Sequence, residues 1–155
     1  MTTPAASDIN LGQDFTVALW ANYGSSPYTD AYLFVNGIAI ERKTNGGYNG
    51  NSLSVLAGTV GVQDNSGVGI PSGTWIHVIV YHSGNTLGIK VNNTGTSTVD
   101  VSGQTLGASS TTYIGYSSSG YSWIGSFDEI GFWNRALTKP EMAALYNGGA
   151  GVTLP

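Results

Sequence analysis

The chain has 155 residues, a net charge of −4 and no cysteine. This length is typical of one domain and is enough to bury a core of its own. The five basic residues form no stripe, so we expect no nucleic-acid partner. No apolar run approaches the ~20 residues of a membrane span, and a chain without cysteine has neither a disulfide nor thiol chemistry.

The surface is expected to be poor in charge, because only 9% of the residues are charged, against about a quarter in most domains. Gly, Ser, Thr and Asn take their place, as is common in secreted modules and virion proteins. The first ten residues, MTTPAASDIN, lack the basic start and apolar core of a signal peptide. We therefore expect an extracellular or virion-surface location, reached either with an export signal that this chain lacks or with a virion on lysis.

Turn-forming residues recur every ~8–12 positions along the chain, a spacing that is typical of a β-sandwich. In the first apolar segment, FTVALWA at 15–21, Phe15, Val17 and Leu19 share one face. Strands are expected at 15–21, 31–35, 38–42, once or twice within 53–62, and at 75–81, 87–91, 96–101, 113–116 and 123–133. The predicted fold is all-β, a single two-sheet antiparallel sandwich over residues 1–155.

Two hairpins stand out among these strands. Asn36-Gly37 lies between two apolar runs, and both positions of such a turn favour positive φ. Segment 75–81 is apolar on both faces, which predicts a central strand covered on both sides. It should pair with 87–91 through the turn Ser83-Gly84-Asn85.

One short helix is expected near the end of the chain. Thr138 is a suitable N-cap, and Glu141 three residues later completes a capping box. Pro140 falls in the first turn, where its missing N–H costs nothing, and Gly148 follows the last turn. The apolar stripe of this helix consists of Met142, Leu145 and Tyr146.

Three stretches together carry a family resemblance over about half of the chain: DFTVALWA at 14–21, GTWIHVIVYHSGNTLGIKVNN at 73–93 and GSFDEIGFWNRALTKPEMAALYN at 125–147. They resemble the first long strand, the central hairpin and the closing strand with its terminal helix in laminin G-like domains of the concanavalin A-like lectin/glucanase superfamily. The resemblance implies a jelly roll used mostly for binding.

The chain departs from that family at its N-terminus. Family members have an extra strand before the region that matches 8–14, and here few residues precede it. The edge strand is therefore missing, supplied by a partner or replaced by 152–155.

A catalytic pair of carboxylates is not evident. The glucanases of this superfamily carry theirs in a Glu-x-Asp-x-x-Glu pattern on one strand, and the chain has no such pattern. Its adjacent acids, Asp128 and Glu129, should point to opposite faces of a strand. We therefore predict that the protein is not an enzyme.

The two histidines, His77 and His82, add no catalytic motif, because no Gly-x-Ser-x-Gly elbow accompanies them and their spacing does not suit zinc. His77 is in phase with Trp75 and Ile79, as expected of a satisfied strand residue. His82 is expected to be solvated at the edge of a turn.

Asp128 is the acid of most interest. It is in phase with Ile130 and Phe132, so it should lean toward the apolar side and need a partner. That partner could be Arg135, backbone N–H groups of the preceding Gly/Ser loop, or calcium held with loop carbonyls. We favour a structural role, and no cofactor is required. Calcium stays open because the family often binds it, with Asp64 as a second candidate ligand in what reads equally well as a plain turn.

Aromatic residues divide between core and loops. Trp20, Trp75, Trp133 and Phe132 are expected in the core. Six others lie in or beside Gly/Ser/Asn loops: Tyr23, Tyr28, Tyr48, Tyr116, Tyr121 and Trp123. Such rings suit the apolar C–H faces of sugars. Four of them, Tyr48, Tyr116, Tyr121 and Trp123, are the predicted ligand-binding residues.

The leading hypothesis is a non-catalytic recognition or adhesion module that binds a carbohydrate or a protein surface. The alternative is a phage virion protein, either a capsid decoration or a tail-fibre adhesin that contacts other virion proteins. A glycan hydrolase is disfavoured by the missing acid pair. The oligomeric state stays open.

Overall fold

The computed structural model describes residues 14–24, 31–35, 37–43, 52–64, 69–104, 106, 112–116 and 121–152. Side chains are described throughout these ranges except at 31, 34, 35 and 43. No helix in these ranges is long and apolar enough to cross a membrane. Residues before 14, where the family has its extra strand, lie outside the described residues, as do 153–155 of the replacement considered at 152–155. Val152 is described and is not in a strand.

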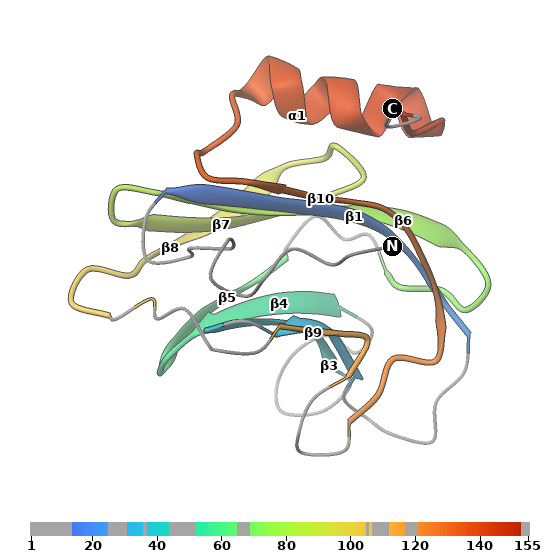
Figure 1. Ribbon diagram of the computed structural model, residues 1–155, viewed down its shortest axis with the longest axis horizontal. Helices are drawn as coiled ribbons and strands as arrows, with labels where there is room; N and C mark the ends of the chain where they lie inside the picture. Colours follow the sequence, from blue (N-terminus) through green and yellow to red (C-terminus); the bar gives the residue numbers. More distant parts are fainter. Residues whose placement is uncertain are drawn as a thin grey trace.

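In the described part of the chain, two five-stranded antiparallel sheets pack face to face, and a helix covers the outer side of one of them (Figure 1). The helix-covered sheet runs β10 (Gly125–Trp133), β1 (Phe15–Tyr23), β6 (Trp75–Ser83), β7 (Thr86–Val91) and β8 (Thr96–Asp100). The second sheet runs β5 (Val60–Gln63), β4 (Ser52–Ala57), β3 (Ile38–Lys43), β2 (Ala31–Val35) and β9 (Tyr113–Ile114). The all-β sandwich predicted from the sequence is confirmed.

The main core lies between the sheets. Phe15, Val17 and Leu19 are each 1% exposed and face the second sheet, as the alternation in this segment predicts. Strand side chains that point to the outer face, Ala18 and Ile79, form a smaller core under the helix together with Leu137 and Met142. Strand β6 is therefore covered on both faces, which confirms its central position.

Both predicted hairpins form. Strands β2 and β3 pair antiparallel around position 37, where Gly37 has a φ of 70°. Strands β6 and β7 pair through a turn at Gly84 and Asn85, and Gly84 has a φ of 59°. The positive φ explains why glycine stands at each turn.

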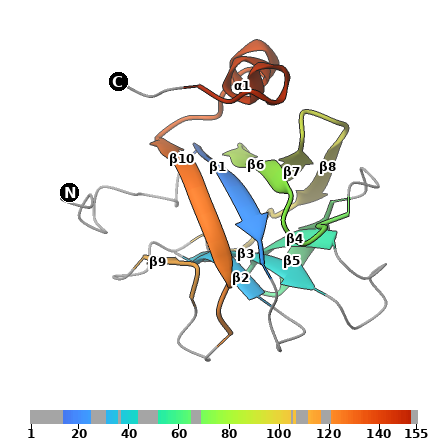
Figure 2. The same cartoon turned by 90° about the vertical axis from the view of Figure 1, so that its right-hand side faces the viewer.

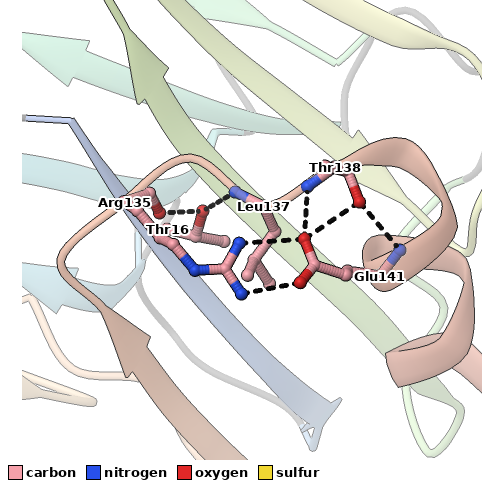
Figure 3. Close-up of polar contacts among 5 residues, drawn as sticks. All are labelled: Thr16, Arg135, Leu137, Thr138 and Glu141. Carbon is pink, nitrogen blue, oxygen red and sulfur yellow. Dashed lines mark hydrogen bonds and ion pairs between the residues drawn. The ribbon is translucent and has the colours of Figure 1, made fainter.

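Helix α1 (Lys139–Tyr146) begins with the predicted capping box. The Glu141 carboxylate accepts from the Thr138 N–H at 2.8 Å and from its hydroxyl at 2.9 Å, and Arg135 donates two further bonds to it at 2.6 and 2.9 Å (Figure 3). The Thr16 hydroxyl of β1 donates to the Arg135 carbonyl and accepts from the Leu137 N–H, both at 2.9 Å. These bonds fix the start of the helix over the sheet (Figure 2).

Candidate functional site

A row of three residues crosses the outer face of the helix-covered sheet. Trp20 of β1 lies opposite Asp128 of β10 on one side and His77 of β6 on the other. Residues directly opposite each other in neighbouring strands share a face of the sheet. The sheet thus presents an indole, an imidazole and a carboxylate to the side that carries the helix.

A β-bulge determines where Asp128 points. Between Ala18 and Trp20 the register shifts, so that Glu129 and Ile130 oppose a single residue of β1. Glu129 has a φ of 48°, as bulged residues often need. The phase of the strand changes there: Ile130 packs against the main core, whereas Asp128 is exposed on the outer face.

Three expectations about Asp128 are therefore wrong. It does not lean toward the apolar side, because the bulge reverses the alternation. It does not pair with Arg135, which bonds Glu141 instead. Its carboxylate accepts from the Glu129 N–H at 2.8 Å rather than from the preceding loop. The expected divergence of Asp128 and Glu129 is also wrong, since both line one pocket.

The end of the chain forms one wall of this pocket. Helix α1 ends at Asn147 in the left-handed conformation, with a φ of 46°, and Gly148 and Gly149 also have positive φ. The chain thereby turns back, and the Val152 N–H donates to the Glu129 carboxylate at 2.8 Å. A single carboxylate of the bulge thus holds the terminal segment beside β10.

The resulting pocket has a volume of about 200 Å³. It is lined by Trp20, Trp75, Asp128, Glu129 and residues 149–151. Trp75 is 42% exposed, so its predicted place in the core is wrong. It is the first residue of β6 and lies on the outer face of the sheet. The apolar pattern of this strand does not show that helix α1 leaves its first residue uncovered.

Two buried nitrogen atoms of the row have no hydrogen-bond partner: Nε1 of Trp20 and Nδ1 of His77. Trp20 is 8% exposed and stacks on Tyr146 of the helix, with ring centroids 5.8 Å apart. His77 lies 5.0 Å from Trp20 and 5.9 Å from Tyr146 between ring centroids. Burial lowers the pKa of His77 to about 4, so the imidazole is neutral at physiological pH.

His77 is in phase with Trp75 and Ile79, as predicted, but its imidazole is not fully satisfied. The prediction for His82 is wrong: it is only 8% exposed and stacks on Phe15, with ring centroids 5.8 Å apart. Its Nδ1 lies 3.8 Å from the Asp14 carboxylate.

The predicted loop aromatics are only partly exposed. Trp123 is 6% exposed, belongs to the main core and donates from Nε1 to the Asn22 carbonyl at 3.2 Å. Its predicted exposure to a ligand is wrong, because the ring packs against Tyr23 and Phe127 in the main core. Tyr48 and Tyr28 lie outside the described residues.

Tyr116 and Tyr121 are 44% and 40% exposed and lie near the β9 edge of the second sheet. The Trp123 N–H bonds the Gly115 carbonyl at 2.8 Å, which brings their two segments together. They form a second exposed aromatic area, on the other sheet from Trp75.

The two candidate calcium ligands lie apart. Asp128 belongs to β10, an edge of the helix-covered sheet, whereas Asp64 is buried at the end of β5, which packs below β7 and β8 at the opposite edge. Within the part of the chain that the structure describes, no three carboxylates or imidazoles gather as a metal site.

Solved structures with the same fold belong to diverse proteins. A heptameric pentraxin from Limulus polyphemus matches with a TM-score of 0.67 and 16% identity, over 93% of this chain and 74% of its own. A putative carbohydrate-binding protein from Bacteroides ovatus matches with a TM-score of 0.68 and 19% identity, over 84% of this chain and 40% of its own.

Domain 4 of an extracellular arabinanase from Geobacillus stearothermophilus, solved with arabinotriose, has a TM-score of 0.65 and 15% identity, over 86% of this chain and 66% of its own. At these identities the likeness concerns the fold. No curated protein matches the chain in sequence. A family model does match residues 1–143, and the chain belongs to the concanavalin A-like lectin/glucanase superfamily.

Proposed function

We propose that the protein is a non-catalytic recognition module that binds a carbohydrate in the pocket between Trp75 and Asp128. The observation that carries the proposal is that an exposed tryptophan and an exposed carboxylate line one pocket of about 200 Å³. The indole face suits the apolar C–H face of a sugar ring, and carboxylates accept hydrogen bonds from sugar hydroxyls.

Trp20 extends the aromatic part of the lining. Its indole N–H is buried, so the part of Trp20 that a ligand would contact is the ring and not the nitrogen. A sugar would lay a C–H face against the indoles and donate from its hydroxyls to the carboxylates.

The pocket holds two carboxylates, which is the number that glycoside hydrolysis uses. Here both accept bonds from backbone N–H groups: Asp128 from Glu129 within the bulge, and Glu129 from Val152 at the chain end. These bonds position the bulge and the terminal segment, and the remaining carboxylate lone pairs are left to accept from sugar hydroxyls. We therefore propose binding without hydrolysis. The carbohydrate-binding protein and the arabinanase domain of the same fold are consistent with a binding role.

The test is a glycan array followed by affinity measurement on the glycans retained. Trp75→Ala should weaken binding by about 2 kcal/mol, or roughly thirtyfold in Kd, because a central aromatic contact is lost. Tyr121→Ala is the matched control, since it removes a ring of similar exposure from the other sheet. Binding that survives Trp75→Ala but not Tyr121→Ala would move the site to the tyrosines.

Each array is repeated with a calcium chelator and followed by a reducing-sugar assay on the bound glycan. We expect binding without released sugar, and retention in chelator if the pocket acts without metal. Absence of binding in every condition would favour a purely structural role, such as the virion decoration that the sequence also suggests.

A further inference from the structure

The described cations of this acidic chain are of two kinds. Arg135 bonds the Glu141 carboxylate at 2.6 and 2.9 Å. Arg42 is 7% exposed, and its guanidinium carbon lies 4.2 Å from the centre of the Tyr23 ring. Lys90 and Lys139, by contrast, form no ion pair with any described residue. The charge of both lysines is therefore uncompensated within this part of the chain.

Both lysines line the same cavity, which has a volume of about 190 Å³. Lys90 comes from β7 and Lys139 from the first turn of α1. The described lining contains no carboxylate, and three hydroxyl groups complete its polar part: Tyr81, Ser83 and Thr96. Two like charges that face one cavity repel each other, and a bound anion would offset that repulsion.

The residues around this cavity are not those that would best stabilise the sheet or the helix. Lys139 places a positive charge in the first helical turn, where the helix dipole favours negative charge. Gly88 is small enough for Tyr81 to lie across it: a Cβ at this position would be 2.5 Å from the Tyr81 ring. Glycine weakens a strand interior and often marks a close approach. The close approach at Gly88 thus keeps the Tyr81 ring in the lining of the cavity that both lysines share.

The rest of the lining is apolar, formed by Ala136, Leu137 and Met142. A ligand that fits must therefore carry a negative charge and also an apolar face. Burial raises the pKa of Tyr81, so its hydroxyl keeps its proton and can donate.

We propose that this cavity, the lysine pocket, binds a carboxylate-bearing sugar of the uronic acid type. The carboxylate is taken by Lys90 and Lys139, the ring hydroxyls by Ser83, Thr96 and Tyr81, and the apolar ring face by Leu137 and Met142. Charge-assisted bonds to the carboxylate supply selectivity over neutral sugars. The lysine pocket is separate from the pocket of Trp75 and stands whether or not that pocket binds glycan.

The test is an NMR titration of the ¹⁵N-labelled protein with sodium D-glucuronate, with D-glucose and sodium acetate as separate probes. We expect glucuronate to shift the amide signals around Ser83, Thr96 and Leu137 most, and to bind at least fivefold more tightly than glucose or acetate. Lys90→Gln and Lys139→Gln should each weaken glucuronate binding by roughly tenfold or more, the loss of one charged hydrogen bond. Added salt should weaken it further.

Lys43→Gln is the control, because it changes the net charge equally but lies in β3 of the other sheet. Thermal melts confirm that each variant is folded. Glucose binding as tight as glucuronate, or equal losses in all three lysine variants, would overturn the proposal. Acetate binding as tight as glucuronate would overturn the sugar and leave a bare carboxylate site. Glucuronate shifts at Trp75 with none at the lysine pocket would also overturn it, without touching the function proposed for Trp75.

Discussion

At the scale of single residues, the tryptophans show how the same side chain serves different purposes. Trp123 is packed at 5.1 Å from Tyr23 and 5.7 Å from Phe127 between ring centroids, inside the main core. Trp75 has no such enclosure and is 42% exposed. The burial thus gives Trp123 a role in stability, and we propose recognition for Trp75. The same substitution to alanine tests both roles.

Trp123→Ala should lower the free energy of unfolding by about 3–5 kcal/mol, because it opens a cavity and leaves the Asn22 carbonyl without its donor. Trp75→Ala should change it by less than about 1 kcal/mol, since a partly exposed ring loses little packing. Urea unfolding followed by circular dichroism measures both. Similar losses for the two variants would contradict the burial assigned here.

At the scale of elements, the sequence predicted what local chemistry determines. The glycines at positions 37 and 84 mark hairpins because their turns need positive φ, and Thr138 with Glu141 marks the helix start because the two cap each other. The bulge in β10 was missed. Its signal was present, however: Phe127 and Ile130 both face the core although they are three residues apart, a spacing that strict alternation forbids.

The cover of the outer sheet face could not be predicted in this way. Which part of that face α1 shields depends on contacts distant in the chain, such as the bonds of Thr16 to Arg135 and Leu137. Trp75 and Ile79 lie on the same face of β6, four residues apart. Trp75 stays exposed and Ile79 is covered, and no local sequence pattern distinguishes the two. The pocket was therefore found only in the structure.

The capping box gives a prediction for acid pH. Bonds from Arg135 and Thr138 lower the pKa of Glu141 to about 2. A depressed carboxyl pKa contributes stability that is present above the unfolded value and is lost as pH falls through the folded one. Glu141→Gln should therefore melt at a lower temperature than the wild type at pH 7, and the gap should close toward pH 2.

Thr138→Ala is the companion variant. It removes the N-cap side chain, which should cost about 1 kcal/mol of unfolding free energy, while the Arg135–Glu141 pair stays in place. The difference in melting temperature between Thr138→Ala and the wild type should persist at low pH more than the difference between Glu141→Gln and the wild type. A gap for Glu141→Gln that is constant from pH 7 to pH 2 would show that the carboxylate does not act through its charge.

At the scale of the whole molecule, the described residues form three layers, two sheets and one helix (Figure 2). The contact between helix and sheet includes the polar side chains of His77 and Tyr146. Tyr146 closes over Trp20 and His77, and His77 is 2% exposed with Nδ1 unpartnered. A neutral imidazole is tolerated there, whereas an imidazolium would be buried without compensation. The docking of the helix layer should therefore depend on pH.

The folded pKa of His77 is about 4, below its ordinary value of 6.5. Between these values the unfolded chain binds a proton that the folded protein does not, so stability is complete above about pH 6.5 and falls as the pH drops to about 4. The loss should approach about 3 kcal/mol, at 1.36 kcal/mol per pH unit. His77→Leu cannot titrate and removes the unpartnered nitrogen, so it should match the wild type at pH 7.5 and exceed it at pH 4. Urea unfolding of both proteins across this range measures the difference, in which the other titrating groups cancel, and parallel curves would show that protonation of His77 does not control the helix layer.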